Sequence, residues 1–370
     1  MAGRPAHLFL MCVGAVACGG GAGDDGSEIL MPFDGLSGGV VFATSAIVGS
    51  NGYDLFWAPV PQFPTLNAQP VTRLTETTGN EWQPSISANG RALAFARQDQ
   101  GIFLISESGR IKQISDTVDT PFKDSLPAVS PDGVRVAWTR EDTSKPIGET
   151  GFFETVIMMA NFDGSEARAL SPKVNVVQDA ARFDPKMGSN RIAWSEFNAA
   201  TLLVNGPQSY GVWLQDFVLG TGTFLCEGNA VVDQAAYRCF GQHLAWPLDN
   251  ALVLTQSFLE LYVDRSPATS SYDTLLTTLT GQNLGVPLLE GPEGFFAAFP
   301  LSASYLGSQR MIVDGIVSST DGDLPGLAFF ISDVDGSGLW RLNLANYYAD
   351  YDPQNTAGFF FSVATPQLIP

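Results

Sequence analysis

Two stretches of this sequence repeat one another and decide the fold. Residues Pro84 to Arg97 read PSISANGRALAFAR, and residues Pro127 to Arg140 read PAVSPDGVRVAWTR, so that the two match position by position. Each stretch begins as a strand of alternating character, passes through Asn-Gly or Asp-Gly, and enters a second strand that contains alanine next to an aromatic residue. Asn and Asp tolerate a positive φ and Gly adopts it freely, so each dipeptide predicts a tight hairpin turn.

Looser copies of this unit continue along the chain. Phe183-Asp184-Pro185 leads to Ile192-Ala193-Trp194, and Leu244-Ala245-Trp246 forms another aromatic-ending strand. A second motif of two strands and a polar, glycine-containing turn follows the hairpins: residues 157–171 read IMMANFDGSEARALS and residues 330–342 read FISDVDGSGLWRL. Four strands in each repeat are typical of a propeller blade.

These repeats predict an all-β chain in which residues 38–370 form a single β-propeller of four-stranded blades. Three strands are expected in 38–78, and complete blades near 82–118, 124–172, 178–228, 233–283 and 292–345. The tail Tyr348 to Thr365 is expected to pair with strands near Gly39 to Ser45, because ring closure removes exposed sheet edges. This arrangement gives six blades, and seven is the alternative count.

The stretch PAVSPDGVRVAWTR, followed by MMANFDGSEARALS at 158–171, resembles the blade repeat of TolB and its relatives. In that family the first stretch supplies the two inner strands of a blade and the second supplies the two outer strands. The resemblance covers about residues 38 to 365 and is strongest over 82–197. It implies structural roles for the turn residues, which are Asn89, Gly90, Asp132, Gly133, Asp163 and Gly164.

The N-terminus predicts a lipoprotein signal peptide over residues 1–18. Arg4 precedes a short apolar run from Leu8 to Ala17, which is too short to span a bilayer. The run ends in Ala15-Val16-Ala17-Cys18, which resembles the lipobox in which the cysteine is lipidated. Residues 19–37 begin GGGAGDDGSE, a composition expected of a flexible tether between an acyl anchor and a domain. An ordinary cleaved signal peptide is the alternative.

The charge of the chain limits its partners. Thirty-eight acidic residues and 19 basic ones give a net charge of −19. Nucleic acid would be repelled, because binding to phosphates requires Lys and Arg to displace counterions. Adhesion to anionic lipid through charge is equally disfavoured, so the sequence predicts membrane contact through the lipid anchor only.

Two cysteines, Cys226 and Cys239, remain in the predicted mature chain. In an exported protein, cysteines this close in sequence are candidates for a disulfide, and the bond would require the segment between them to fold back on itself. Two buried free thiols are the alternative.

Catalytic chemistry has little support in the sequence. Only His243 lies outside the signal peptide, and it sits on a predicted strand where a structural role is the simpler reading. Paired Asp or Glu near a propeller axis could act on a glycan, but many acids occupy predicted turns. Asp333 and Asp335 precede a glycine turn as in calcium loops, although a plain blade turn also accounts for them and no other cofactor is expected.

We therefore expect a non-enzymatic lipoprotein of the cell envelope, periplasmic or on the cell surface and anchored in the outer membrane. Its propeller would act as a scaffold that binds an envelope protein or a peptide ligand. The alternatives are a polymer- or glycan-active propeller enzyme that uses axial carboxylates and a calcium-stabilised surface adhesin.

Overall fold

The computed structural model describes residues 36, 38–44, 53–77, 79–106, 109–199, 210–227, 230–232, 235–239, 246, 252–263, 266–278, 283–287, 295–306, 310–319, 326–333, 338 and 340–345. Within these ranges the chain is almost entirely β-structure, as the repeats predict.

The strands form six antiparallel sheets that follow the order of the chain. The first sheet contains β1 (Gly39–Thr44), β2 (Asp54–Pro59) and β3 (Thr72–Arg73). The second contains β4 (Glu81–Ile86), β5 (Leu93–Arg97), β6 (Gly101–Ile105) and β7 (Ile111–Gln113). The third contains β8 (Phe122–Val129), β9 (Arg135–Pro146), β10 (Phe153–Asn161) and β11 (Arg168–Leu170). The fourth contains β12 (Val176–Phe183), β13 (Arg191–Asn198), β14 (Tyr210–Asp216) and β15 (Thr221–Glu227).

The last two sheets complete this order. The fifth contains β16 (Ala230–Val232), β17 (Ala235–Cys239), β18 (Leu252–Val263), β19 (Ser266–Thr278) and β20 (Asn283–Pro287). The sixth contains β21 (Phe295–Leu306), β22 (Arg310–Ser319), β23 (Gly326–Asp333) and β24 (Trp340–Leu342). The sheets thus correspond to the blade segments that the sequence predicts, except that the fifth has an additional strand.

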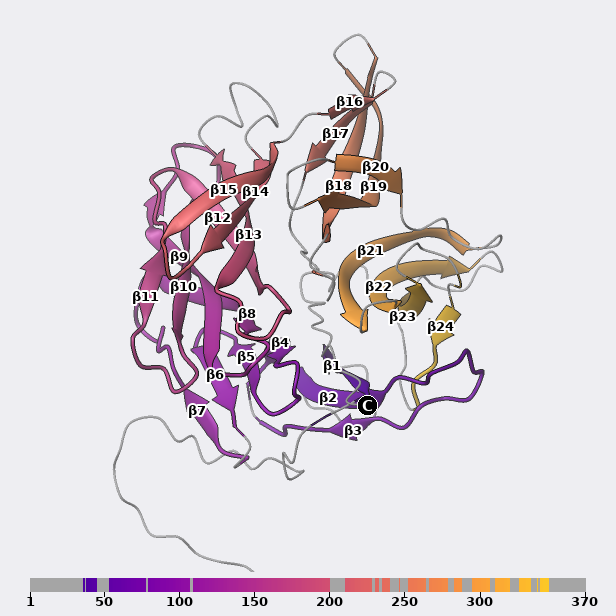
Figure 1. The fold of residues 1–370 in the computed structure, drawn as a ribbon, viewed down its shortest axis with the longest axis horizontal. Coiled ribbons are helices and arrows are strands. Elements are labelled where there is room, and N and C mark those ends of the chain that lie inside the picture. The colour runs from indigo at the N-terminus through magenta and orange to yellow at the C-terminus, as the bar shows by residue number, and fades with distance from the viewer. Residues whose placement is uncertain are drawn as a thin grey trace, which may run out of the picture.

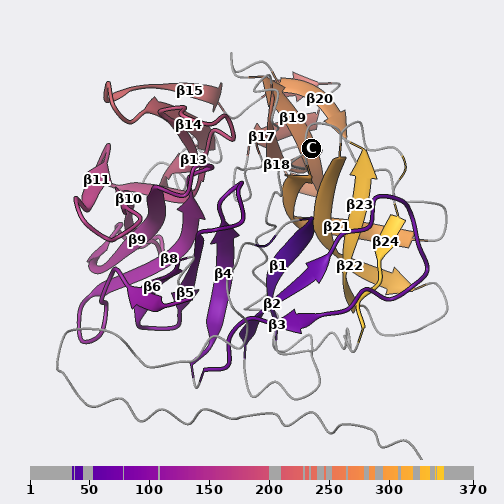
Figure 2. The same cartoon turned by 60° about the horizontal axis from the view of Figure 1, so that its bottom comes forward.

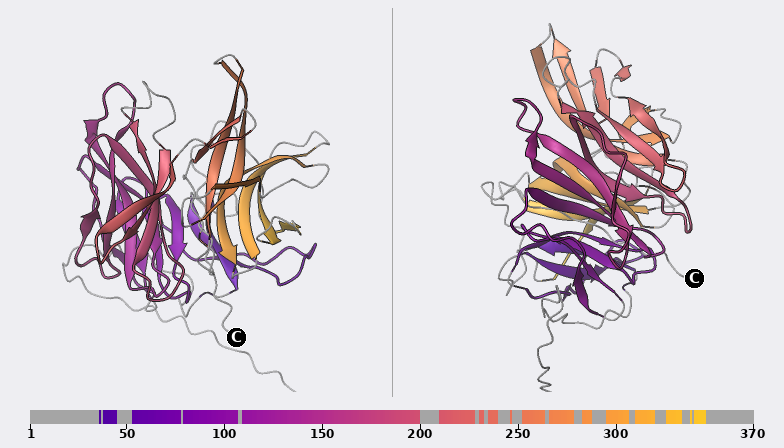
Figure 3. Two further views of the ribbon diagram at one scale, coloured as in Figure 1. Left: turned by 45° about the horizontal axis from the view of Figure 1, so that its top comes forward. Right: turned by 90° about the vertical axis from the view of Figure 1, so that its left-hand side faces the viewer.

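The sheets succeed one another around a ring (Figure 1). Consecutive sheets touch along this path, through β1 with β4, β4 with β8, β8 with β12, β14 with β17 and β19 with β21. Figure 3 shows the second to fourth sheets on one side of the molecule and the fifth and sixth on the other. Since β4, β8 and β12 are the first strands of their sheets and contact one another, they are the inner strands of those blades.

Strand β5 illustrates why this sequence builds a ring of sheets. Leu93 and Phe95 are fully buried in the core between the first and second sheets. The alternate residues Ala94 and Ala96 are buried in the core between the second and third sheets. Because successive side chains of a strand point to opposite faces, a strand that is apolar at every position must be covered on both sides. The run Leu93-Ala-Phe-Ala therefore requires a neighbouring sheet on each face.

The first and last sheets also share a core, which joins the two ends of the ring. Val40, Phe42 and Phe56 of the first sheet are buried with Phe329 and Ile331 of the sixth. The rings of Phe42 and Phe329 meet edge to face with centroids 5.3 Å apart. A parallel bridge between Gln69 and Leu344 adds a backbone connection between the same two sheets.

The predicted role of the C-terminal tail is not tested. The segment Tyr348 to Thr365 lies outside the described residues, and the first sheet contains three strands in the part of the chain that the structure describes. The number of blades, six or seven, therefore stays a prediction.

Candidate functional site

The predicted turn residues act through the backbone. Gly90, Gly133 and Gly164 have φ values of 71°, 74° and 81°, which a glycine adopts without strain. Asn89, Asp132 and Asp163 do not share this left-handed geometry and use their side chains instead. Each Oδ1 accepts a hydrogen bond from the backbone N–H two residues later, namely Arg91 (3.0 Å), Val134 (3.1 Å) and Ser165 (2.9 Å). These contacts give the six residues a structural role.

A buried acid–base pair stands at the start of the inner strand in the second sheet. Glu81 of β4 is fully buried, and its Oε1 lies 2.9 Å from Nη2 of Arg97 on β5. Burial raises the pKa of Glu81, and the hydrogen bonds from Thr75, Arg97 and Thr77 oppose this shift. The guanidinium of Arg97 also lies 4.2 Å from the ring centroid of Phe103. The pair is therefore enclosed by strands and an aromatic side chain.

The third sheet repeats this pair at the equivalent positions. Asp124 of β8 accepts two hydrogen bonds from Arg140 of β9, one from Nε (2.8 Å) and one from Nη2 (2.6 Å). This bond raises the pKa of the Arg140 guanidinium. Glu81 and Asp124 stand three residues before PSIS and PAVS, and Arg97 and Arg140 end the two repeats.

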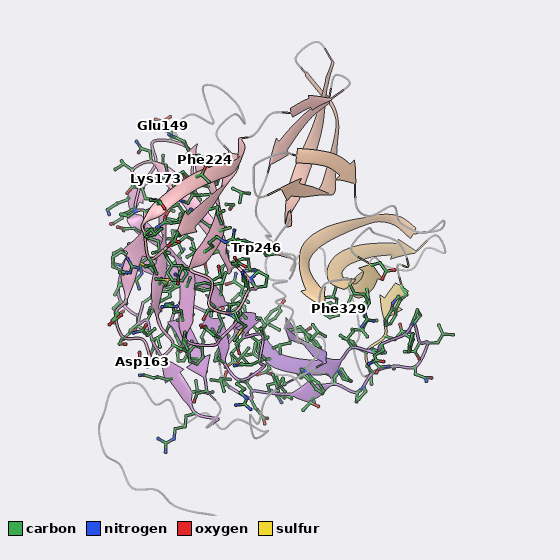
Figure 4. All side chains as sticks on the ribbon, in the orientation of Figure 1. Glu149, Asp163, Lys173, Phe224, Trp246 and Phe329 are labelled. Atoms are coloured by element: carbon green, nitrogen blue, oxygen red, sulfur yellow. The ribbon has the colours of Figure 1, made fainter. Side chains whose placement is uncertain are left out.

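The fourth sheet has polar residues at the same two positions, but they are not an acid and an arginine. Gln178 occupies the acid position of β12, and Glu196 occupies the arginine position of β13, with Gln178 Nε2 3.0 Å from Glu196 Oε2. The cation comes from the preceding loop: Lys173 Nζ lies 2.6 Å from Glu196 Oε1. It also lies 3.9 Å from the ring centroid of Trp213. Figure 4 shows Lys173 and Phe224 near each other, at the end of this part of the ring opposite to Asp163.

Each of these inner strands contains a left-handed residue shortly after the polar position. Gln83, Leu126 and Ala180 have φ values of 53°, 49° and 53°, and the pairing register of each strand shifts there. A non-glycine residue in this conformation costs about 1–3 kcal/mol and persists only where its surroundings hold it. In the third sheet the backbone N–H of Leu126 donates to Oε1 of Gln83, at 2.7 Å. One inner strand thus fixes the bulge of the next.

The bulge of β12 presents a titratable group. Oδ1 of Asp179 accepts hydrogen bonds from Thr139 Oγ1 (3.0 Å) and from the N–H of Ala180 (2.9 Å). Desolvation raises the pKa of Asp179 to about 6, and nearby Glu141 acts in the same direction. Desolvation also lowers the pKa of Arg182, which donates to the carbonyl of Ala181. Both side chains nevertheless remain partly exposed, so they are surrounded by protein and still reach solvent.

An aromatic pair lies at the start of the inner strand of the second blade. The rings of Tyr53 and Trp82 stack with centroids 5.6 Å apart and an angle of 6° between their planes. Both side chains are partly exposed. We refer to Tyr53, Trp82, Asp179 and Arg182 as the rim group, because all four are partly exposed and lie on or next to the inner strands β4 and β12.

The predicted lipidation, calcium and disulfide residues are not part of the rim group. Cys18 and Asp335 lie outside the described residues, and Asp333 is exposed at the end of β23. Cys226 is paired with Val212 in the fourth sheet, and Cys239 with Ser257 in the fifth. A disulfide would therefore join two sheets, and it stays a prediction.

The described ranges contain neither a candidate metal site nor a candidate membrane-spanning helix. No group of three or more His, Cys, Asp and Glu side chains there is arranged to hold a metal ion. No helix among the same residues has the length and apolar character that a bilayer span requires.

The sequence prediction missed the rim group. Asp132 and Asp163 lie in turns, whereas Asp179 lies on the inner strand β12. The available signal was the repeat itself: Glu81 and Asp124, like Arg97 and Arg140, occupy matching positions. Extending that match to Gln178 and Glu196 would have marked the polar position of each inner strand.

The fold and this geometry define the chain as a β-propeller. No family model matches it, and no curated protein matches it in sequence. Among solved structures it is similar to TolB from Acinetobacter baumannii, with a TM-score of 0.50 and 14% identity over 83% of this chain and 63% of that one. It is also similar to an oligogalacturonate lyase in complex with manganese, with a TM-score of 0.50 and 12% identity over 86% of this chain and 76% of that one. The propeller is of the TolB type in fold, and at these identities the likeness concerns the fold alone.

Proposed function

We propose that this chain is an exported lipoprotein, anchored through Cys18, whose propeller binds a protein or peptide of the cell envelope at the rim group. The observation that carries the binding proposal is the partial exposure of Trp82, Asp179 and Arg182 on strands whose strained bulges are held by neighbouring blades. Rigid inner strands that offer an aromatic face, a carboxylate and a guanidinium suit a polypeptide, which has apolar and charged groups close together.

Site-specific photo-crosslinking in the living cell tests the binding site. A photoreactive amino acid at position 82 or 182 should give a covalent adduct with a cellular protein. The same amino acid at Leu219, which is 73% exposed in the turn between the outer strands β14 and β15, should give none. Absence of adducts at both rim positions, or equal adducts at Leu219, would contradict a binding site at the rim group.

A separate experiment tests the anchor. Cys18→Ser should convert a membrane-retained protein into one that is released to the soluble fraction, because no acyl chain can be attached. The same fractionation for both forms would contradict lipidation while leaving the crosslinking result intact.

A glycan-active enzyme is the second candidate, and one observation favours it. Asp179 is a carboxyl on an inner strand with a pKa of about 6, which is suitable for proton transfer near neutral pH. Release of reducing or unsaturated ends from oligogalacturonate or other acidic polysaccharides, lost in Asp179→Asn, would support this function. No release from a panel of such polymers by the parent chain would argue against it.

A further inference from the structure

The connection between β2 and β3 is an anchored loop with an unusual surface. Residues 59–72 read PVPQFPTLNAQPVT and contain no charged side chain, in a chain whose net charge is −19. Phe63 and Leu66 in this loop are 76% and 95% exposed, the highest values among the large apolar residues described. Figure 2 shows the loop running past β24 at the edge of the molecule.

The loop is held by the sixth sheet through its backbone. The N–H of Gln69 donates to the carbonyl of Asn343 (2.8 Å), and the N–H of Ala345 donates to the carbonyl of Gln69 (2.8 Å). Nη1 of Arg310 donates to the carbonyl of Gln62 (2.8 Å). The side chains of Phe63 and Leu66 take no part in these bonds, so the sixth sheet fixes the loop and leaves its two apolar side chains in solvent.

The loop begins where the N-terminal segment enters the propeller. The N–H of Val60 donates to the carbonyl of Gly38, at 2.7 Å. If Cys18 is lipidated, residues 19–35 are all that separates the bilayer from this point. The apolar loop therefore starts next to the point at which an anchored segment would enter the propeller.

We infer that the loop of residues 59–72 is a membrane-contacting element, in which Phe63 and Leu66 enter the headgroup region and orient the propeller on the bilayer. This inference rests on the lipid anchor of the proposed function. An uncharged loop is the part of a strongly acidic protein that an anionic lipid surface repels least. Burial of two large apolar side chains supplies a favourable contribution that does not depend on charge. The sequence predicted contact through the acyl chain only; the loop adds a second contact.

Tethered vesicles test the inference without relying on acylation. The mature chain, with a hexahistidine tag at its N-terminus, is attached through nickel-chelating lipid to vesicles of phosphatidylethanolamine and phosphatidylglycerol. An environment-sensitive fluorescent amino acid replaces Phe63 or, as a control, Leu219, which is 73% exposed in the turn between β14 and β15. We expect a blue shift and quenching by brominated acyl chains at position 63 and neither effect at position 219.

A pair of variants gives a second measurement. Phe63→Ser with Leu66→Ser should lower the vesicle-bound fraction of the untagged, unlipidated chain, by about tenfold in affinity for each side chain. The matched control, Val218→Ser with Leu219→Ser, should leave that affinity unchanged. Thermal melting should be the same for both variants, because the loop is held through its backbone.

The results of these experiments distinguish a failure of the membrane-contact inference from a failure of the lipid-anchor proposal. No response at position 63 on tethered vesicles, or equal responses at 63 and 219, would overturn the inference. A response at 63 that appears with an envelope protein fraction and not with vesicles would assign the loop to a protein partner and also overturn it. A response at 63 together with a soluble native chain would leave the loop assignment standing and contradict only the lipidation of Cys18.

Discussion

The polar position on the inner strand is paired in one way in the second and third sheets and in another way in the fourth. In the second and third, an acid on the inner strand is paired with an arginine on the next strand, as Glu81 is with Arg97. In the fourth, Gln178 replaces the inner acid, and Glu196 receives a cation from the loop residue Lys173. The polar position is thus retained in all three blades, but the residues that supply the acid and the cation differ between them.

The difference concerns how much of each pair is in contact with water. The side chains of Glu81 and Arg97 are 0% and 5% exposed, whereas in the fourth blade the carboxylate of Glu196 is 5% exposed and its cation, Lys173, is 32% exposed. A cation that approaches from a loop can keep part of its hydration, so its removal is less costly than removal of a cation from a closed site. The second blade should therefore depend on its ion pair for stability, and the fourth should not.

Removal of the enclosed cation should have the largest effect. Arg97→Met leaves the buried carboxylate of Glu81 without its charge partner, and we expect the free energy of unfolding to fall by about 3–5 kcal/mol. Urea denaturation measures this change. Glu81→Gln combined with Arg97→Met should recover much of the loss, and Lys123→Met, in a pair of 3.8 Å with Glu141 at the surface, should change stability little. A loss below about 1 kcal/mol for Arg97→Met would remove the distinction between the blades.

Titration of Asp179 in the fourth blade should make the free energy of unfolding depend on pH. Its pKa is raised from 3.8 to about 6 in the folded chain, so the folded state binds more protons between these values. The stabilising contribution of the protonated carboxyl is complete below about pH 4 and is lost as the pH rises through 6, by about 3 kcal/mol at most. Asp179→Asn should lack this dependence relative to the parent when unfolding is measured from pH 4 to 7. The same slope in both proteins would assign the dependence to other groups.

The geometry of the third blade predicts a smaller loss for a change that keeps the charge. Arg140→Lys cannot reproduce the two parallel hydrogen bonds to Asp124, and we expect a loss of about 1–2 kcal/mol. Lys145→Arg, at an exposed pair with Asp142, is the matched control and should have no measurable effect on the urea midpoint. Full stability of Arg140→Lys would show that charge alone, without bidentate geometry, is sufficient at this position.

Lys173→Met should have the smallest effect, at about 1 kcal/mol or less. Glu196 retains donors in Gln178 Nε2 and Trp194 Nε1, at 3.0 and 3.3 Å, so it is not left without hydrogen bonds. Salt should reduce the effect further, because the ammonium is partly exposed. Unfolding at low and at high sodium chloride concentration checks this expectation, and an effect as large as that of Arg97→Met would contradict the proposed difference.

The periodicity of the sequence was sufficient to predict most of the architecture. The four-stranded unit follows from the alternation around Phe95 and Trp138 and from the glycine turns, since these are local properties of the chain. The additional strand β16 was not predicted, because the three-residue run Ala230–Val232 is too short to show a period.

The candidate site was not predicted for a different reason. The raised pKa of Asp179 and the bulge at Ala180 depend on Thr139 and on other residues of neighbouring strands, which a local pattern does not reveal. The same holds for the loop of residues 59–72. Its attachment to Asn343 depends on ring closure between distant parts of the chain, so its position could not be read from its own residues.

The entry point of the N-terminal segment also has a mechanical consequence. The N–H of Leu36 donates to the carbonyl of Gly90 in the second blade, and Gly38 is bonded to Val60 in the first. A pull on this segment along the direction of β1 would load the hydrogen bonds between Gly39–Thr44 and Asp54–Pro59 at the same time, because those bonds run perpendicular to the strands. Bonds loaded in parallel must rupture together, whereas bonds that are peeled rupture one at a time. A pull that reaches Gly39 along β1 would therefore meet the β1–β2 hydrogen bonds together and not one after another.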